Sequence, residues 1–99
     1  MRLNLAQVEA SAKRLFPDLN VEQVLAELLL ERAQKNLVKY QTMARQFETK
    51  YKQDFAAFRA QVLNSRPVSE VEQDYFDWEL AVTGVTDMAE EIQRLKSLG

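Results

Sequence analysis

The sequence predicts an all-α fold, and three observations support this prediction. Apolar residues between Ala26 and Tyr51 recur at alternating steps of four and three, which is the 3.5-residue period of a helix that packs along one edge. A second stripe with the same period runs from Val71 to Ile92. Only two Gly and two Pro occur in 99 residues, so little interrupts long helices. We therefore expect an antiparallel helical hairpin.

Each stripe is narrow, and polar residues fill most of the positions around it. The first stripe consists of Ala26, Leu30, Ala33, Leu37, Tyr40, Ala44, Phe47 and Tyr51. The second consists of Val71, Tyr75, Trp78, Val82, Val85, Ala89 and Ile92. A narrow stripe is typical of a helix that packs against one partner helix, so the chain carries both members of the pair.

A short first helix is predicted over residues 5–16. Asn4 and Gln7 have the spacing of a capping box, and Pro17 ends the helix because the residue before proline is pushed out of the α region. The predicted apolar face consists of Leu5, Val8, Ala12 and Leu15 or Phe16. About three turns are marginal in water, so we expect this helix to pack on the rest of the chain.

The long helix is predicted over residues 21–51. Asn20 and Gln23 repeat the capping-box spacing at its start. After Tyr51 the apolar period slips, and Asp54 is a good N-cap, which predicts a break near residues 52–53 and a short helix over residues 55–63. The alternative is one continuous helix with a stutter.

An acidic helix is predicted over residues 69–95, after the loop that contains Pro67. Ser69 and Glu72 have the spacing of a third capping box, and acids in the first turn suit the helix dipole. Gly84 lies inside this helix, where it costs about 1 kcal/mol relative to Ala. It marks either a close helix crossing or a kink.

Composition limits the function. The length suits one domain over residues 1–99. The chain lacks Cys and His, which excludes thiolate nucleophiles, imidazole bases and Cys/His zinc sites. No apolar run is long enough to cross a membrane and the N-terminus does not resemble a signal peptide, so we expect a cytoplasmic protein. We predict no enzymatic activity and no cofactor.

Charge is divided sharply along the chain. Residues 31–66 contain eight bases and three acids, whereas residues 69–91 contain eight acids and no base. Three interpretations follow. Aromatic residues rimmed by acids suit a protein interface that attracts a basic partner. Glu70, Asp74 and Asp77 could instead share one helix face as Mg²⁺ ligands in an all-α nucleotide pyrophosphatase, and the bases of the long helix could bind nucleic acid.

The most unusual stretch lies in the acidic helix, and it gives the candidate partner-binding residues Glu72, Asp74, Tyr75, Phe76, Asp77, Trp78 and Glu79. The pattern Y-x-x-x-F-x-x-F that begins at Tyr51, followed after a loop by V-E-x-D-Y-F-D-W-E, resembles small helical antitoxin-like proteins encoded beside putative toxins in prokaryotes. The matched positions are Tyr51, Phe55, Glu72, Asp74, Tyr75, Asp77, Trp78 and Glu79.

The resemblance implies a protein that binds and neutralises a partner protein, with no catalytic residue. An acidic helix could cover a basic active site by charge mimicry. Because a lone two-helix seam buries little surface, we also expect a homodimer in which two hairpins form a helical bundle. The expected function is therefore protein binding; the carboxylate-dependent metal enzyme and the nucleic-acid-binding regulator are the alternatives.

Overall fold

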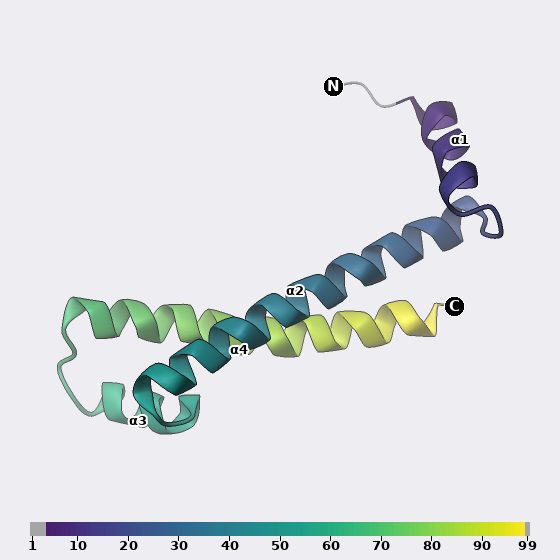
Figure 1. Cartoon of the computed structure of the whole chain (residues 1–99). Coiled ribbons are helices and arrows are strands. Elements are labelled where there is room, and N and C mark those ends of the chain that lie inside the picture. The colour runs from purple at the N-terminus through teal and green to yellow at the C-terminus, as the bar shows by residue number, and fades with distance from the viewer. Residues whose placement is uncertain (1–3, 99) are drawn as a thin grey trace.

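The protein is described by a computed structural model that covers residues 4–98. These residues form four helices and no strand: α1 (Leu5–Leu15), α2 (Val21–Tyr51), α3 (Phe55–Leu63) and α4 (Ser69–Ser97). The predicted all-α class and the four helices are confirmed, with α4 two residues longer and α1 one residue shorter than expected. Figure 1 shows α2 and α4 side by side and α3 at the closed end of the pair.

The helix starts follow the predicted caps in three of four cases. The Asn4 side chain accepts from the backbone N–H groups of Ala6 and Gln7. Asn20 and Gln23 form the complete capping box. Asp54 accepts from the backbone of Ala57 at 2.8 Å. These side chains satisfy N–H groups that have no partner inside the helix.

The predicted capping box at Ser69 is wrong. Val68, which has extended backbone angles, occupies the N-cap position and makes no side-chain cap bond. Ser69 is already the first helical residue, so its hydroxyl is one residue too far along the chain to cap. The acids of the first turn, Glu70 and Glu72, still lie where the helix dipole favours negative charge.

The predicted break after Tyr51 is confirmed, and the stutter is excluded. Lys52 adopts the left-handed conformation with φ of 54°, which ends α2. Gln53 and Asp54 then lead into α3. The break turns α3 back against α4, so the aromatic residues of α3 reach the inside of the hairpin.

The antiparallel pairing of α2 and α4 is shown by their contacts. Lys50 near the end of α2 bonds to Glu70 and Asp74 near the start of α4, and Tyr40 meets Gly84 midway along both helices. A Cβ atom placed on Gly84 would lie 2.6 Å from the Tyr40 ring. Gly84 therefore permits a close helix crossing, and α4 continues through it as one helix.

The predicted seam of α2 is confirmed, and that of α4 is confirmed at six of its seven positions, with Ala89 as the exception. The eight α2 positions are all buried or half-buried. On α4, Ala81 is fully buried and Met88 is half-buried, while Ala89 is exposed. Ala81, Gly84 and Met88 add a second line of contact, one residue before the predicted positions, because small side chains at residues 81 and 84 let the backbones approach.

Helix α1 does not pack along the hairpin as expected. It contains no buried residue, and Leu5 and Leu15 are 67% and 75% exposed. In Figure 1, α1 leaves the start of α2 at a steep angle and points away from α4. The chain is accordingly elongated, with extents of 58 × 32 × 18 Å. None of the helices in residues 4–98 is long and apolar enough to cross a membrane.

Candidate partner-binding site

An aromatic cluster fixes the first half of α4 against α2 and α3. Trp78 is its centre and has no exposed surface, and Phe58 of α3 is 2% exposed. The centroids of these two rings lie 4.9 Å apart. The cluster is completed by Phe47, Tyr51, Phe55 and Tyr75, whose ring centroids lie within 6.5 Å of Trp78 or Phe58. Such ring pairs add about 0.5–1.5 kcal/mol each beyond the area they bury.

The indole N–H of Trp78 is enclosed without a hydrogen-bond partner among the described residues. A buried unpaired donor costs roughly 1–3 kcal/mol, so Trp78 contributes through ring contacts and not through a polar bond. This argues that its role is to hold the three helices together.

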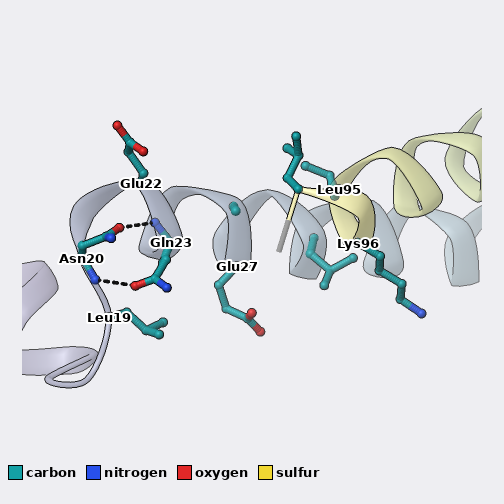
Figure 2. A pocket seen from close by; sticks show the side chains of 10 residues that line it. Leu19, Asn20, Glu22, Gln23, Glu27, Leu95 and Lys96 are labelled. Atoms are coloured by element: carbon teal, nitrogen blue, oxygen red, sulfur yellow. Dashed lines mark hydrogen bonds between the residues drawn. The ribbon is translucent and has the colours of Figure 1, made fainter.

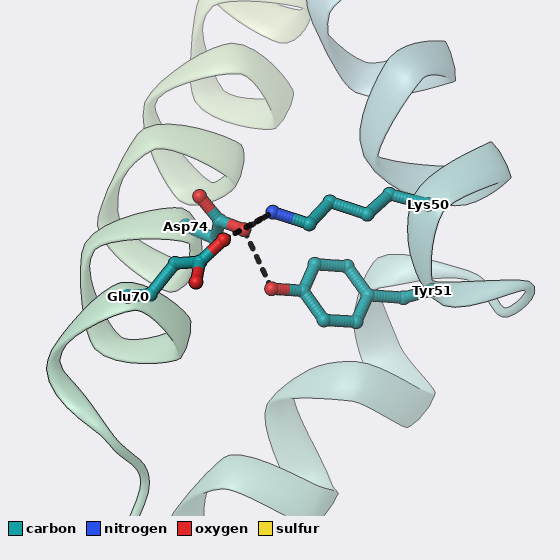
Figure 3. A network of polar contacts seen from close by, with 4 residues as sticks. All are labelled: Lys50, Tyr51, Glu70 and Asp74. Carbon is teal, nitrogen blue, oxygen red and sulfur yellow. Dashed lines mark hydrogen bonds and ion pairs between the residues drawn. The ribbon is translucent and has the colours of Figure 1, made fainter.

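A polar network lies beside the cluster and joins the two long helices (Figure 3). Lys50 donates to Asp74 at 2.6 Å and to Glu70 at 3.1 Å, and the Tyr51 hydroxyl donates to the same Asp74 oxygen at 2.5 Å. The Asp74 side chain is 15% exposed, whereas that of Lys50 is 46% exposed. The network is therefore strongest around Asp74, where water screens it least.

The network shifts the protonation of its members. The bonds from Lys50 and Tyr51 lower the pKa of Asp74 below its usual 3.8. The bonds to Asp74 and Glu70 raise the pKa of Lys50. Burial, followed by the bond to Asp74, raises the pKa of Tyr51. Folding thus favours the charged carboxylate of Asp74 and the protonated phenol of Tyr51.

Asp74→Asn is expected to lower the free energy of unfolding by about 1–2 kcal/mol at pH 7, because the charged acceptor is lost. The folded-state pKa of Asp74 is depressed, so its contribution is complete above the usual value of 3.8 and disappears as the pH falls through the lower folded value. Urea unfolding of both proteins between pH 2 and 7 should show the difference shrink below about pH 4. Asp87→Asn, at an exposed position of α4, is the control. A difference independent of pH would contradict the charged role of Asp74.

The solvent side of the same segment carries a different set of residues. Phe76 and Leu80 are 53% and 57% exposed and lie four residues apart, so they are neighbours on the helix surface. Glu72 and Glu79 are exposed beside them, and Glu79 accepts from the Tyr75 hydroxyl at 3.2 Å. We call Glu72, Phe76, Glu79 and Leu80 the outer face of α4. It presents two exposed apolar side chains next to two carboxylates, and the opposite face of the same helix is packed against α2 and α3.

The seven predicted site residues therefore divide by position. Glu72, Phe76 and Glu79 lie on the outer face. Tyr75 and Asp77 are half-buried, and Asp77 accepts from Gln73 at 3.0 Å. Asp74 is engaged by Lys50 and Tyr51, and Trp78 is enclosed, so neither side chain is free to contact a partner and both leave the candidate interface.

Leu80 belongs to the candidate site although the sequence analysis omitted it. Its spacing of four from Phe76 was a usable signal, because neither residue lies on the α4 stripe. Leu80 is neither acidic nor aromatic, so the pattern that singles out residues 72–79 does not include it.

The geometry bears on both alternatives. Two of the three proposed Mg²⁺ ligands, Glu70 and Asp74, hold the Lys50 ammonium, and no group of three or more acidic side chains within residues 4–98 is arranged to hold a metal ion. The aromatic residues that could have stacked on bases, Phe47 and Tyr51, instead stack on Trp78. Neither alternative gains support from the packing.

Comparison of this chain with models of protein families, with curated proteins and with solved structures finds no match. The resemblance to antitoxin-like proteins therefore stays a prediction.

Proposed function

We propose that this protein is a non-catalytic, antitoxin-like interaction module of the cytoplasm that binds and neutralises a basic partner protein through the outer face of α4. The single observation that supports it is the exposure of Phe76 and Leu80 beside the exposed acids Glu72 and Glu79. Aromatic residues, Phe included, are enriched in protein interfaces, and acids beside them attract a basic partner.

The opposite side of α4 is packed against α2 and α3, and this packing favours binding through the outer face. Tyr75 stacks on Phe55, with ring centroids 5.7 Å apart, and Trp78 is enclosed among rings from α2 and α3. The outer face is therefore organised before a partner arrives, which reduces the conformational entropy lost on association.

Charge sets the kind of partner. Residues 69–91 carry eight acids and no base, and exposed acids such as Glu72 and Glu79 face solvent on α4. A field of this sign speeds association with a basic surface and disfavours acidic ones. A basic active site that acts on RNA or nucleotides fits this description, because the acids would take the place of phosphates.

Phe76→Ala is expected to weaken binding to the product of the adjacent gene by roughly 30-fold or more, as for an interface hot spot. The charge reversal Glu72→Arg with Glu79→Arg should weaken it further and slow association most at low salt. Biolayer interferometry with the purified neighbouring gene product measures both effects, and a growth assay with both genes expressed tests neutralisation.

Two control variants separate the outer face from general surface effects. Val38→Ala removes an apolar side chain of similar exposure, 60%, from α2. Glu31→Arg reverses an exposed acid on the same helix. Both should bind as the wild type does. Equal binding by Phe76→Ala and the double charge reversal, or no binding by the wild type, would overturn the proposal.

A further inference from the structure

Exposed apolar side chains gather at the end of the hairpin opposite the aromatic cluster. We define the open end as α1, the first turns of α2 through Leu30, and the end of α4 from Leu95. Seven of the twelve large apolar side chains that are exposed in residues 4–98 lie there, namely Leu5, Val8, Leu15, Leu25, Leu28, Leu29 and Leu98. Such a concentration of exposed apolar side chains at one end of the molecule suits an interaction surface.

The open end also contains a hollow of about 570 Å³. Its apolar lining includes Leu19, Ala26 and Leu30 from the α2 side, and Leu95 and Leu98 from α4. Figure 2 shows it beside the Asn20–Gln23 capping box, with Leu95 and Lys96 across from the start of α2. In Figure 1, α1 of the same chain points away from α4, and no residue of α1 lines the hollow.

The chain exposes more surface area than a compact monomer of its size. The chain exposes 7837 Å², against roughly 5,800 Å² expected for a compact monomer of this size. The excess, roughly 2,000 Å², is what one subunit buries in an obligate homodimer, where interfaces bury about 2,000–5,000 Å² over both partners. The area thus matches a second copy.

Charge and shape indicate which part of the second copy fits. The apolar stripe of α1 is largely exposed, at Leu5, Val8 and Leu15, and the helix carries two bases, Lys13 and Arg14, in its last turn. The lining of the hollow includes two acids, Glu22 and Glu27, and one base, Lys96. An amphipathic helix with a basic end complements an apolar hollow with an acidic rim.

We propose that the protein is a homodimer in which α1 of each copy packs into the hollow at the open end of the other. Exchange of this kind is reciprocal, so the assembly closes with twofold symmetry. It also provides the packing that an 11-residue helix needs to be stable in water. This inference uses a surface remote from the outer face of α4 and does not depend on the proposed function.

Because the sequence contains no Cys, pairs of introduced cysteines can test this arrangement directly by crosslinking. Val8→Cys chains mixed with Leu30→Cys chains, equilibrated and treated with a short bismaleimide, should give a covalent dimer on a denaturing gel. Val8→Cys mixed with Val38→Cys, which lies outside the hollow, is the matched control and should give little. Crosslinking of the double variant Val8→Cys/Leu30→Cys within one chain, without mixed dimers, would show that α1 folds onto its own hairpin and would overturn the proposal.

Oligomeric mass gives an independent readout. Light scattering after size exclusion should report a dimer for the wild type and for Val38→Ser, and Leu15→Ser should raise the dimer dissociation constant at least tenfold. Circular dichroism at high concentration checks that Leu15→Ser stays helical. A monomeric wild type at tens of micromolar, or a dimer as tight for Leu15→Ser as for Val38→Ser, would contradict the exchange.

Discussion

Trp78→Ala is expected to lower the free energy of unfolding by about 3–5 kcal/mol, the range found when a buried Trp or Phe is truncated. The side chain has no exposed surface, and its ring contacts Phe47, Phe55 and Phe58 with centroids 4.9–5.7 Å away. Truncation leaves a cavity where α2, α3 and α4 meet. The total stability of a domain is roughly 5–15 kcal/mol, so this loss would remove a large share of it. Urea unfolding followed by circular dichroism measures the loss.

Phe76→Ala is the matched control, since it truncates an aromatic residue of the same helix that is 53% exposed. It should change the free energy of unfolding by only about 0.5 kcal/mol. Trp78 is the one Trp of the chain, so the wild-type fluorescence emission should be blue-shifted and should move to the red on unfolding. A loss below about 1 kcal/mol for Trp78→Ala would contradict its place at the centre of the cluster.

Gly84→Leu is expected to destabilise the protein by about 3 kcal/mol, the upper range for overpacking. Even a Cβ atom at this position would lie 2.6 Å from atoms in the body of the Tyr40 ring. The gain in helix propensity on replacing Gly, about 1 kcal/mol, is smaller than this clash. Thermal unfolding measures the loss, and Thr83→Leu, at the exposed neighbouring position, should be close to neutral.

The Tyr40→Ala/Gly84→Leu double variant tests the cause. If Tyr40 is what fills the space over Gly84, removing its ring makes room for the leucine, and the double variant should be more stable than the sum of the single losses predicts, by about 1–2 kcal/mol. Strict additivity would show that the two residues do not meet, and the close crossing would then be wrong.

Local chemistry explains why the boundaries of the helices were predictable. Asn20 and Gln23 satisfy each other's backbone within four residues, and the Asp54 side chain caps α3 by accepting from the backbone N–H of Ala57. The break at Lys52 followed from the slip of the apolar period, and Pro17 acted on its immediate neighbour. Ser69 failed because Val68, which has no capping side chain, already occupies the N-cap position. Spacing alone cannot distinguish an N-cap from the residue that follows it.

The candidate site was less predictable, since it depends on which side chains are buried or hydrogen-bonded within the fold and which stay exposed. Seven neighbouring residues of an acidic and aromatic stretch were predicted to bind a partner. In the folded protein Trp78 is buried in the aromatic cluster, and Asp74 accepts hydrogen bonds from Lys50 and Tyr51. Leu80 stays exposed beside Phe76. Each assignment requires knowledge of the opposite helix.

By itself the sequence determined the helical class, the four helices, the antiparallel pairing of a basic and an acidic helix, and the position of the break, because periodicity, caps and charge act over a few residues. Tertiary structure alone decided that the α4 contact line passes through Ala81 and Gly84, that Tyr40 fills the space left by the missing side chain, and that α1 stands apart from the hairpin. The reason is physical: the line along which two helices touch, and the surface they leave bare, depend on how closely their backbones approach, and that distance is set by side chains on both helices together.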